Sequence, residues 1–95
     1  MITRVLKSKE SLKDYEFHKT DVLHDEEKKK IRRHKLNKAM RLGNSFKQKV
    51  KMTFKVVDYQ YSMTLDAIVM AVGDQYVSLR GGKTIPVRSI ESVEI

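Results

Sequence analysis

Phe46-Lys47-Gln48-Lys49-Val50-Lys51-Met52-Thr53-Phe54-Lys55-Val56 alternates between apolar and mainly basic residues. Because successive side chains of a β-strand point to opposite faces, this pattern predicts a strand over residues 46–56 with one apolar and one lysine-lined face. The apolar face needs a core to pack against, so we expect the strand to belong to an antiparallel sheet. The lysine face points to a polyanionic partner.

The chain has 95 residues, which is enough for one small domain, and a formal net charge of +8. Before Asp58 there are 17 Lys and Arg against 7 Asp and Glu, and from Asp58 onward there are 3 against 5. There is no cysteine, which excludes disulfides and thiolate chemistry. Because no apolar run approaches the ~20 residues of a membrane span, and no signal peptide is recognisable, we expect a cytoplasmic protein with no membrane partner.

A basic helix is predicted over residues 21–42, within a segment that spans 21–43. Asp21 is a suitable N-cap. Gly43 is a suitable stop, because glycine readily adopts the left-handed conformation that follows many helices. The last three turns carry the apolar residues that can pack on a sheet.

Residues 1–20 form a poorly defined segment with scattered apolar residues and no clean period. Ser11-Leu12-Lys13-Asp14 has the form of a capping box, which favours a short helical turn. An edge strand over residues 2–6 fits equally well. The sequence does not choose between these alternatives.

The remainder of the chain, residues 45–95, has the pattern of an all-β unit. Turns are predicted at Gly73-Asp74 and Gly81-Gly82, and a helical turn near residues 88–90. Pro86 cannot donate a ladder hydrogen bond, so its strand should lie at an edge or carry a bulge. These signals divide the unit into five strands, over residues 46–56, 61–72, 75–80, 83–87 and 92–95.

The predicted strand over residues 61–72 is too long for a small flat sheet and must bend. From Ile68 onward both of its faces are apolar, because Ile68, Met70 and Val72 alternate with other apolar residues. We expect the end of the helix to cover this patch, with a second copy of the chain as the alternative. The expected fold class is therefore α+β, mostly β: a basic N-terminal helix followed by a five-stranded antiparallel, partly open barrel.

The order of these elements resembles the small barrels of Sm-like and Src-homology-3-like domains, chiefly over Leu79-Arg80-Gly81-Gly82-Lys83-Thr84-Ile85-Pro86-Val87-Arg88-Ser89-Ile90-Glu91-Ser92-Val93-Glu94-Ile95. With Ala39-Met40-Arg41-Leu42-Gly43-Asn44, this tail also resembles a family of short, uncharacterised bacterial proteins. The resemblance covers about residues 36–95. Sm-like domains imply RNA binding and ring assembly, but their ligand-contacting loop residues do not match here. The bacterial family implies no activity.

No catalytic constellation is recognisable in the sequence. The three histidines lack metal-ligand spacing, and no pair of carboxylates is placed for acid–base chemistry. Gly82-Lys83-Thr84 resembles the end of a phosphate-binding loop, but Val77 stands where that loop requires glycine, and Pro86 forbids the helix that should follow. We therefore expect a protein that is not an enzyme, with no cofactor, no metal and no small-molecule substrate.

Two functions fit the sequence. The first is binding of nucleic acid or another polyanion, with lysine and arginine contacting phosphates and tyrosine stacking on exposed bases. The second is a protein-interaction or self-assembling scaffold, in which the partner is a homo-oligomer and the strand lysines only prevent aggregation. The residues predicted to contact a polyanion are Lys47, Lys49, Lys51, Lys55, Lys28, Lys29, Arg32, Arg33, Lys35, Tyr59 and Tyr61.

Overall fold

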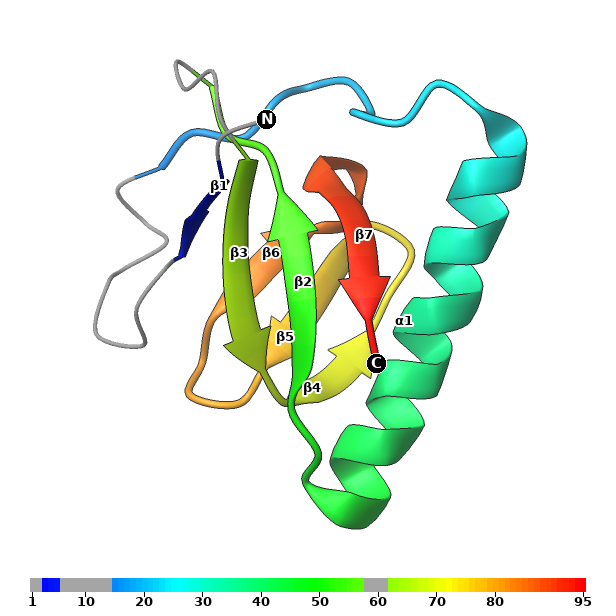
Figure 1. Cartoon of the computed structure of the whole chain (residues 1–95), viewed down its shortest axis with the longest axis vertical. Helices are drawn as coiled ribbons and strands as arrows, with labels where there is room; N and C mark the ends of the chain where they lie inside the picture. The colour runs from blue at the N-terminus through cyan, green and yellow to red at the C-terminus, as the bar shows by residue number, and fades with distance from the viewer. Residues whose placement is uncertain (1–2, 6–14, 58–61) are drawn as a thin grey trace.

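The structure is a computed structural model of the chain that describes residues 3–5, 15–57 and 62–95. These residues form an α+β domain with one α-helix and more strand than helix (Figure 1). The helix is α1 (Glu26–Phe46). The strands are β1 (Thr3–Val5), β2 (Val50–Phe54), β3 (Ser62–Ala67), β4 (Val69–Val72), β5 (Tyr76–Leu79), β6 (Thr84–Pro86) and β7 (Ile90–Glu94), with a 3-10 turn, η2 (Val87–Ser89), before β7.

The strands form two sheets rather than a closed barrel. In the first sheet the order is β1-β3-β2-β7, and in the second it is β4-β5-β6. Strands β3, β2 and β7 pair antiparallel, whereas β1 joins the edge of β3 in parallel. The predicted α+β class is thus confirmed, but six strands follow the helix instead of five. Strand β1 corresponds to the edge-strand alternative for residues 2–6.

The sixth strand arises because the predicted strand over residues 61–72 is two strands. The chain pairs with β2 as far as Ala67 and with β5 from Val69 onward. Ile68 lies at the bend between them, and its carbonyl accepts a hydrogen bond from the Arg80 N–H at 2.9 Å. Ile68 and Val69 are both buried at this bend, which accounts for the consecutive apolar residues there, whereas Met70 and Ala71 are exposed.

Helix α1 begins and ends about four residues later than the sequence predicts. Asp25 is the N-cap, and its side chain accepts a hydrogen bond from the Glu27 N–H at 2.9 Å. The helix continues through Gly43 to Phe46, and Lys47 takes the left-handed conformation at the C-cap with φ 52°. Phe46 therefore belongs to the helix and is 74% exposed, whereas the alternating pattern placed it on the apolar face of a strand.

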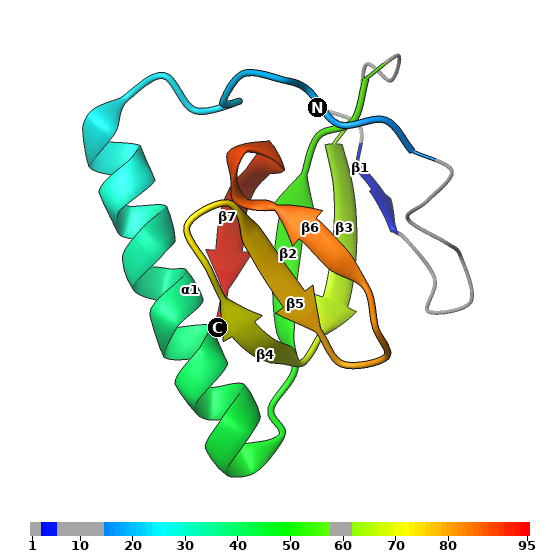
Figure 2. The same cartoon turned by 180° about the vertical axis from the view of Figure 1, so that it is seen from behind.

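The helix lies beside two strands that are the edges of different sheets. It packs against β4 and β7, and Figures 1 and 2 show it along both from opposite sides of the molecule. The helix is therefore the element between the edges of the two sheets, and intramolecular cover of β4 is confirmed. The cover is incomplete, because Met70 remains 45% exposed.

Gly43 sets how closely the helix approaches β4. A Cβ atom at this position would lie 2.3 Å from the carbonyl oxygen of Val69 and 3.2 Å from Cγ2 of Ile68. A contact of 2.3 Å with a backbone atom requires the helix or the strand to move. The glycine that the sequence presents as a helix stop is instead a buried contact inside the helix.

We expect Gly43→Ala to lower the free energy of unfolding by about 1–3 kcal/mol, because the added methyl overpacks a backbone contact. Helix propensity alone would give the opposite sign, since Ala is favoured over Gly by about 0.5–1 kcal/mol inside a helix. Urea denaturation of both proteins measures the difference. Asn44→Ala is the control: it lies on the exposed neighbouring position and should be neutral or slightly stabilising. A Gly43→Ala protein more stable than the parent would contradict this packing.

The segment before the helix also contacts the core. Tyr15 and Phe17 pack against it, and the Phe17 ring centroid lies 6.3 Å from that of Phe54. The Val57 N–H donates to the Glu16 carbonyl at 2.7 Å. In the described part of the chain, no helix is both long enough and apolar enough to span a membrane.

Candidate polyanion-binding surface

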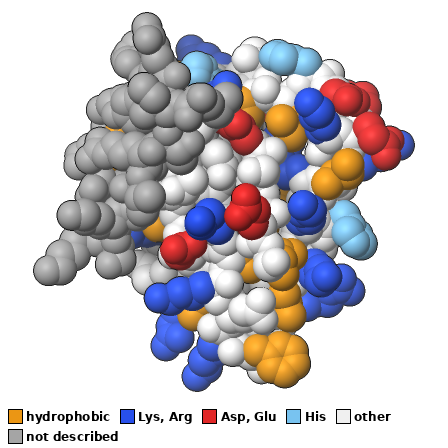
Figure 3. All heavy atoms as spheres, in the orientation of Figure 1, with side chains coloured by type: hydrophobic (Ala, Val, Ile, Leu, Met, Phe, Trp, Pro, Cys, Tyr) orange, Lys and Arg blue, Asp and Glu red, His pale blue; other side chains and the backbone are white. Residues whose placement is uncertain are grey.

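Lys51 on β2 and Lys55, which directly follows β2, lie on a face of mixed charge. Strand β2 is central in its sheet, and Lys51 is directly opposite Asp66 on β3 and Glu94 on β7. Directly opposite residues on neighbouring strands project to the same face, so a carboxylate flanks Lys51 on each side. Lys55 is near a third, with Nζ 3.8 Å from Oε1 of Glu91. Figure 3 shows acidic and basic side chains intermixed on this side of the molecule.

The other two lysines of the predicted strand precede β2. Lys47 is the C-cap of α1, and Lys49 stands just before β2. Both are exposed, and neither forms an ion pair with any other residue that the structure describes. The predicted row of four lysines is therefore two pairs with different surroundings. Lys47 and Lys49 adjoin the end of the helix, whereas Lys51 and Lys55 lie among carboxylates.

Arg32 is buried and links the segment before α1 to strand β7. It is 6% exposed, and its NH1 and NH2 atoms donate to Oδ1 and Oδ2 of Asp21 at 2.8 and 2.6 Å. NH1 also donates to the carbonyl of Ile90, the first residue of β7, at 2.9 Å. Such a bidentate, charge-assisted pair fixes the segment before the helix against the helix and the sheet. Although the sequence places Arg32 among the polyanion contacts, its side chain is not at the surface.

Asp21, the N-cap that the sequence predicts, is the counterion of Arg32 instead. Burial by itself raises the pKa of this carboxyl. Hydrogen bonds from Arg32 and from the Leu23 N–H, with the positive charges of Arg32 and Lys29, outweigh burial and bring the Asp21 pKa below its usual value. Asp21 is therefore ionised throughout the neutral range.

The other predicted helix cations also divide between internal contacts and solvent. Arg33 donates to the carbonyls of Gly73 and Asp74 at 2.8 and 3.1 Å, which ties α1 to the β4–β5 turn. Lys29 pairs with Glu26 across one helical turn at 3.2 Å. Two of the predicted contacts remain exposed without an ion pair to the described residues, Lys28 and Lys35. The predicted stacking residues, Tyr59 and Tyr61, lie outside the described residues.

A second basic face on α1 was not singled out from the sequence. The exposed residues Lys30, His34, Lys38 and Arg41 recur at helical spacing opposite the buried residues Arg32, Leu36, Ala39 and Gly43. We call these four exposed residues the outer helix face. Its cations form no ion pair within the described chain. A sequence signal does exist, because no Asp or Glu occurs between Glu27 and Asp58.

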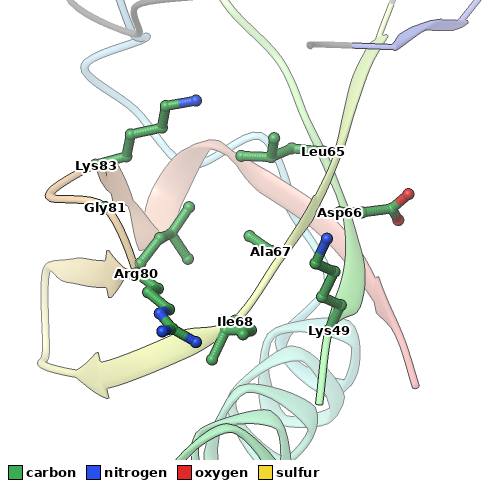
Figure 4. Close-up of a pocket in the computed structure, with 9 residues that line it drawn as sticks. Lys49, Leu65, Asp66, Ala67, Ile68, Arg80, Gly81 and Lys83 are labelled. Atoms are coloured by element: carbon green, nitrogen blue, oxygen red, sulfur yellow. The ribbon is translucent and has the colours of Figure 1, made fainter. Parts of the chain in front are cut away.

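A pocket of about 310 Å³ lies where the two sheets diverge. Its apolar floor is formed by Leu65, Ala67, Ile68 and Leu79, and its rim includes Lys49 and Arg80 (Figure 4). The side chains of Asp66 and Lys83 also line it but point away from Ile68 in this view. Elsewhere in the described residues, no group of three His, Asp or Glu side chains is placed to hold a metal ion.

No protein-family model, curated protein or solved structure matches this chain.

Proposed function

We propose that this protein is a non-enzymatic polyanion-binding module whose ligand is nucleic acid. The observation that carries the proposal is the outer helix face, where Lys38 and Arg41 are exposed in the part of α1 that follows Glu27 and contains no acidic residue. Lys47 and Lys49 extend the same charge beyond the end of the helix. Binding through these residues differs from binding through the strand lysines, because Lys51 and Lys55 are already balanced by acidic neighbours.

The spacing of the outer helix face suits a phosphate backbone. Residues four apart on a helix are about 6 Å apart along its axis, which is close to the separation of phosphates along an extended strand. Exposed lysine and arginine contact phosphates without reading sequence, and they release condensed counterions when they do so. We therefore expect the protein to contact the phosphate backbone of the nucleic acid, with an affinity that falls steeply as the salt concentration rises.

We expect Lys38→Gln with Arg41→Gln to weaken binding of a mixed-sequence oligonucleotide and to reduce the slope of log K against log salt by about two, one unit for each lost contact. Fluorescence anisotropy across a salt series measures both quantities. Folding should change by no more than about 0.5 kcal/mol for each exposed substitution.

The matched control is Lys51→Gln with Lys55→Gln, which also removes two positive charges, but from the mixed-charge face at β2. If net charge alone attracted the ligand, both double variants would lose affinity equally. The proposal requires the Lys51→Gln, Lys55→Gln variant to keep most of the parent's slope of log K against log salt. Loss of the slope only in the strand variant would move the binding surface to β2, and no binding by the parent protein would reject a nucleic-acid function.

One observation favours the scaffold function as the second candidate. Phe46 is largely exposed at the end of α1, and Ile31 and Ile95 are exposed as well. Large apolar side chains at a surface are common in protein–protein contacts. Under this alternative, the mass in solution rises with protein concentration, and Phe46→Ser abolishes the rise.

The order of elements from α1 to β7 also supports the proposed likeness to Sm-like small barrels. A bent strand pair, a Gly81-Gly82 turn, a 3-10 turn and a short last strand follow the helix in that order. The division into two sheets is a departure from a continuous barrel. Because likeness in fold does not carry a function, the proposed ligand rests on the charged surface alone.

A further inference from the structure

The pocket at the bend between β3 and β4 combines two kinds of surface. Its floor is apolar, and Leu65, Ile68 and Leu79 are almost fully buried beneath it. Its rim carries the exposed cations Lys49 and Arg80, which come from opposite sides of the pocket in Figure 4. A ligand that fills both surfaces needs a flat apolar part next to an anionic group. A nucleotide unit has that chemistry, with a base and a phosphate.

The mouth of the pocket is open and held in shape by backbone hydrogen bonds. Arg80 N–H donates to the Ile68 carbonyl at 2.9 Å, and Leu79 N–H donates to the Lys83 carbonyl at 2.8 Å. Gly81 has φ +96° and no neighbouring atom within 4 Å of where its Cβ would lie, so no other group crowds this position of the mouth. A preformed pocket loses little conformational freedom when a ligand enters it.

The size of the pocket selects among nucleic acids. A volume of about 310 Å³ is at the lower end of the range for small-molecule sites. It accommodates a single nucleotide unit rather than a duplex. Bases in a duplex are stacked and paired, so only a single strand can turn one base into such a pocket without breaking pairs.

We propose that this pocket binds one base of a single-stranded nucleic acid, with the base on the floor and its phosphate beside Lys49. Arg80 can stack its guanidinium plane on the base at the rim, as arginine does in single-stranded RNA recognition. Lys47, two residues before Lys49, is the C-cap of α1, the helix that carries the outer helix face. This inference rests on the proposed function and adds to it a preference for single strands and for bases.

The test compares two ligands with equal numbers of phosphates: a labelled oligothymidine and an abasic oligomer of the same length. We expect the full chain to bind oligothymidine about tenfold more tightly than the abasic oligomer, which corresponds to one base held by stacking and apolar contact. Ala67→Leu, which narrows the floor, should reduce this ratio to about one while leaving binding of the abasic oligomer unchanged.

The matched control is Ala71→Leu, which makes the same change on an exposed position of β4 outside the pocket and should keep the ratio. Arg80→Gln is a second pocket variant on an exposed side chain, so it tests the ratio even if Ala67→Leu does not fold. Its control is Lys38→Gln, which loses one charge from the outer helix face and should weaken both ligands equally.

Each outcome separates the two proposals. If the parent binds both oligomers equally and with steep salt dependence, the module binds nucleic acid but the base pocket is rejected. A preference for bases that survives both pocket variants also rejects the pocket. If the parent binds neither oligomer, the proposed function fails and the pocket inference fails with it.

Discussion

Asp21→Asn is expected to lower the free energy of unfolding by about 3 kcal/mol, near the lower end of the 3–5 kcal/mol found when a buried ion pair loses one partner. The loss is large because the Arg32 guanidinium remains buried with its charge uncompensated. We place the value at the lower end because Asp21 is partly exposed and asparagine still accepts one hydrogen bond. Urea denaturation at neutral pH measures the change.

The control removes both partners. Asp21→Asn with Arg32→Met should recover part of the lost stability, because no isolated charge remains in the interior. If the double variant loses more unfolding free energy than the two single variants lose together, the ion pair is not the source of the effect.

Acid titration of stability tests the same pair without changing the arginine. Because the Asp21 pKa is lower in the folded protein than in the unfolded chain, its stabilising contribution is fully present above the unfolded pKa of about 3.9 and is lost as the pH falls through the folded pKa. The parent should therefore lose stability below about pH 4 more steeply than Asp21→Asn. Parallel stability curves for the two proteins would contradict the assignment.

Phe54→Ala is expected to lower the free energy of unfolding by about 3–5 kcal/mol, because it leaves a cavity in the core. Phe54 is 0% exposed, its ring is 6.3 Å from that of Phe17, and its strand neighbours are Met63 on β3 and Ile90 on β7. For a domain with a total stability of about 5–15 kcal/mol, this is a large fraction.

Phe46→Ala is the matched control for Phe54→Ala, since it makes the same chemical change on the exposed end of α1. Its expected effect is within about 0.5 kcal/mol. Thermal and urea denaturation of the two variants distinguish them directly. Equal losses of unfolding free energy would contradict a structure in which Phe54 is buried in the core and Phe46 is exposed.

The sequence predicts features that depend on the local backbone. Gly81 and Gly82 both have positive φ, as the expected turn requires, and Pro86 is on β6, an edge strand, as the loss of its N–H donor requires. A 3-10 turn follows, near where a helical turn was predicted. These features were predictable because glycine and proline act on their own dihedral angles and hydrogen bonds, whatever the rest of the chain does.

The predicted ends of the helix were wrong, because the true ends depend on contacts with residues far along the chain. Both Asp21 and Asp25 are suitable caps; Asp25 caps α1, and the carboxylate of Asp21 pairs with Arg32 instead. Gly43 resembles a helix stop until its contact with Val69 is known. The bend at Ile68 has the same origin, since it follows from pairing with two different strands.

The candidate site shows the same limit. The alternation in residues 46–56, interrupted at Gln48, correctly predicted that Lys51 is exposed. The carboxylates opposite Lys51 come from β3 and β7, and a single strand carries no information about register. The outer helix face was derivable from helical spacing and from the absence of acidic residues after Glu27. The pocket was not, because its floor and rim come from three separated segments.

The position of α1 between β4 and β7 has a consequence for self-association. The Arg32 guanidinium donates a hydrogen bond to the carbonyl of Ile90 at the start of β7. Gly43 lies against the carbonyl of Val69 at the start of β4. If the helix leaves, both strands become open edges that can pair with another chain. Because the two edges differ, pairing of β4 of one copy with β7 of the next would repeat head to tail, which gives a ring if the rotation closes and a filament if it does not. The docked helix therefore covers two strand edges that another chain could otherwise pair with.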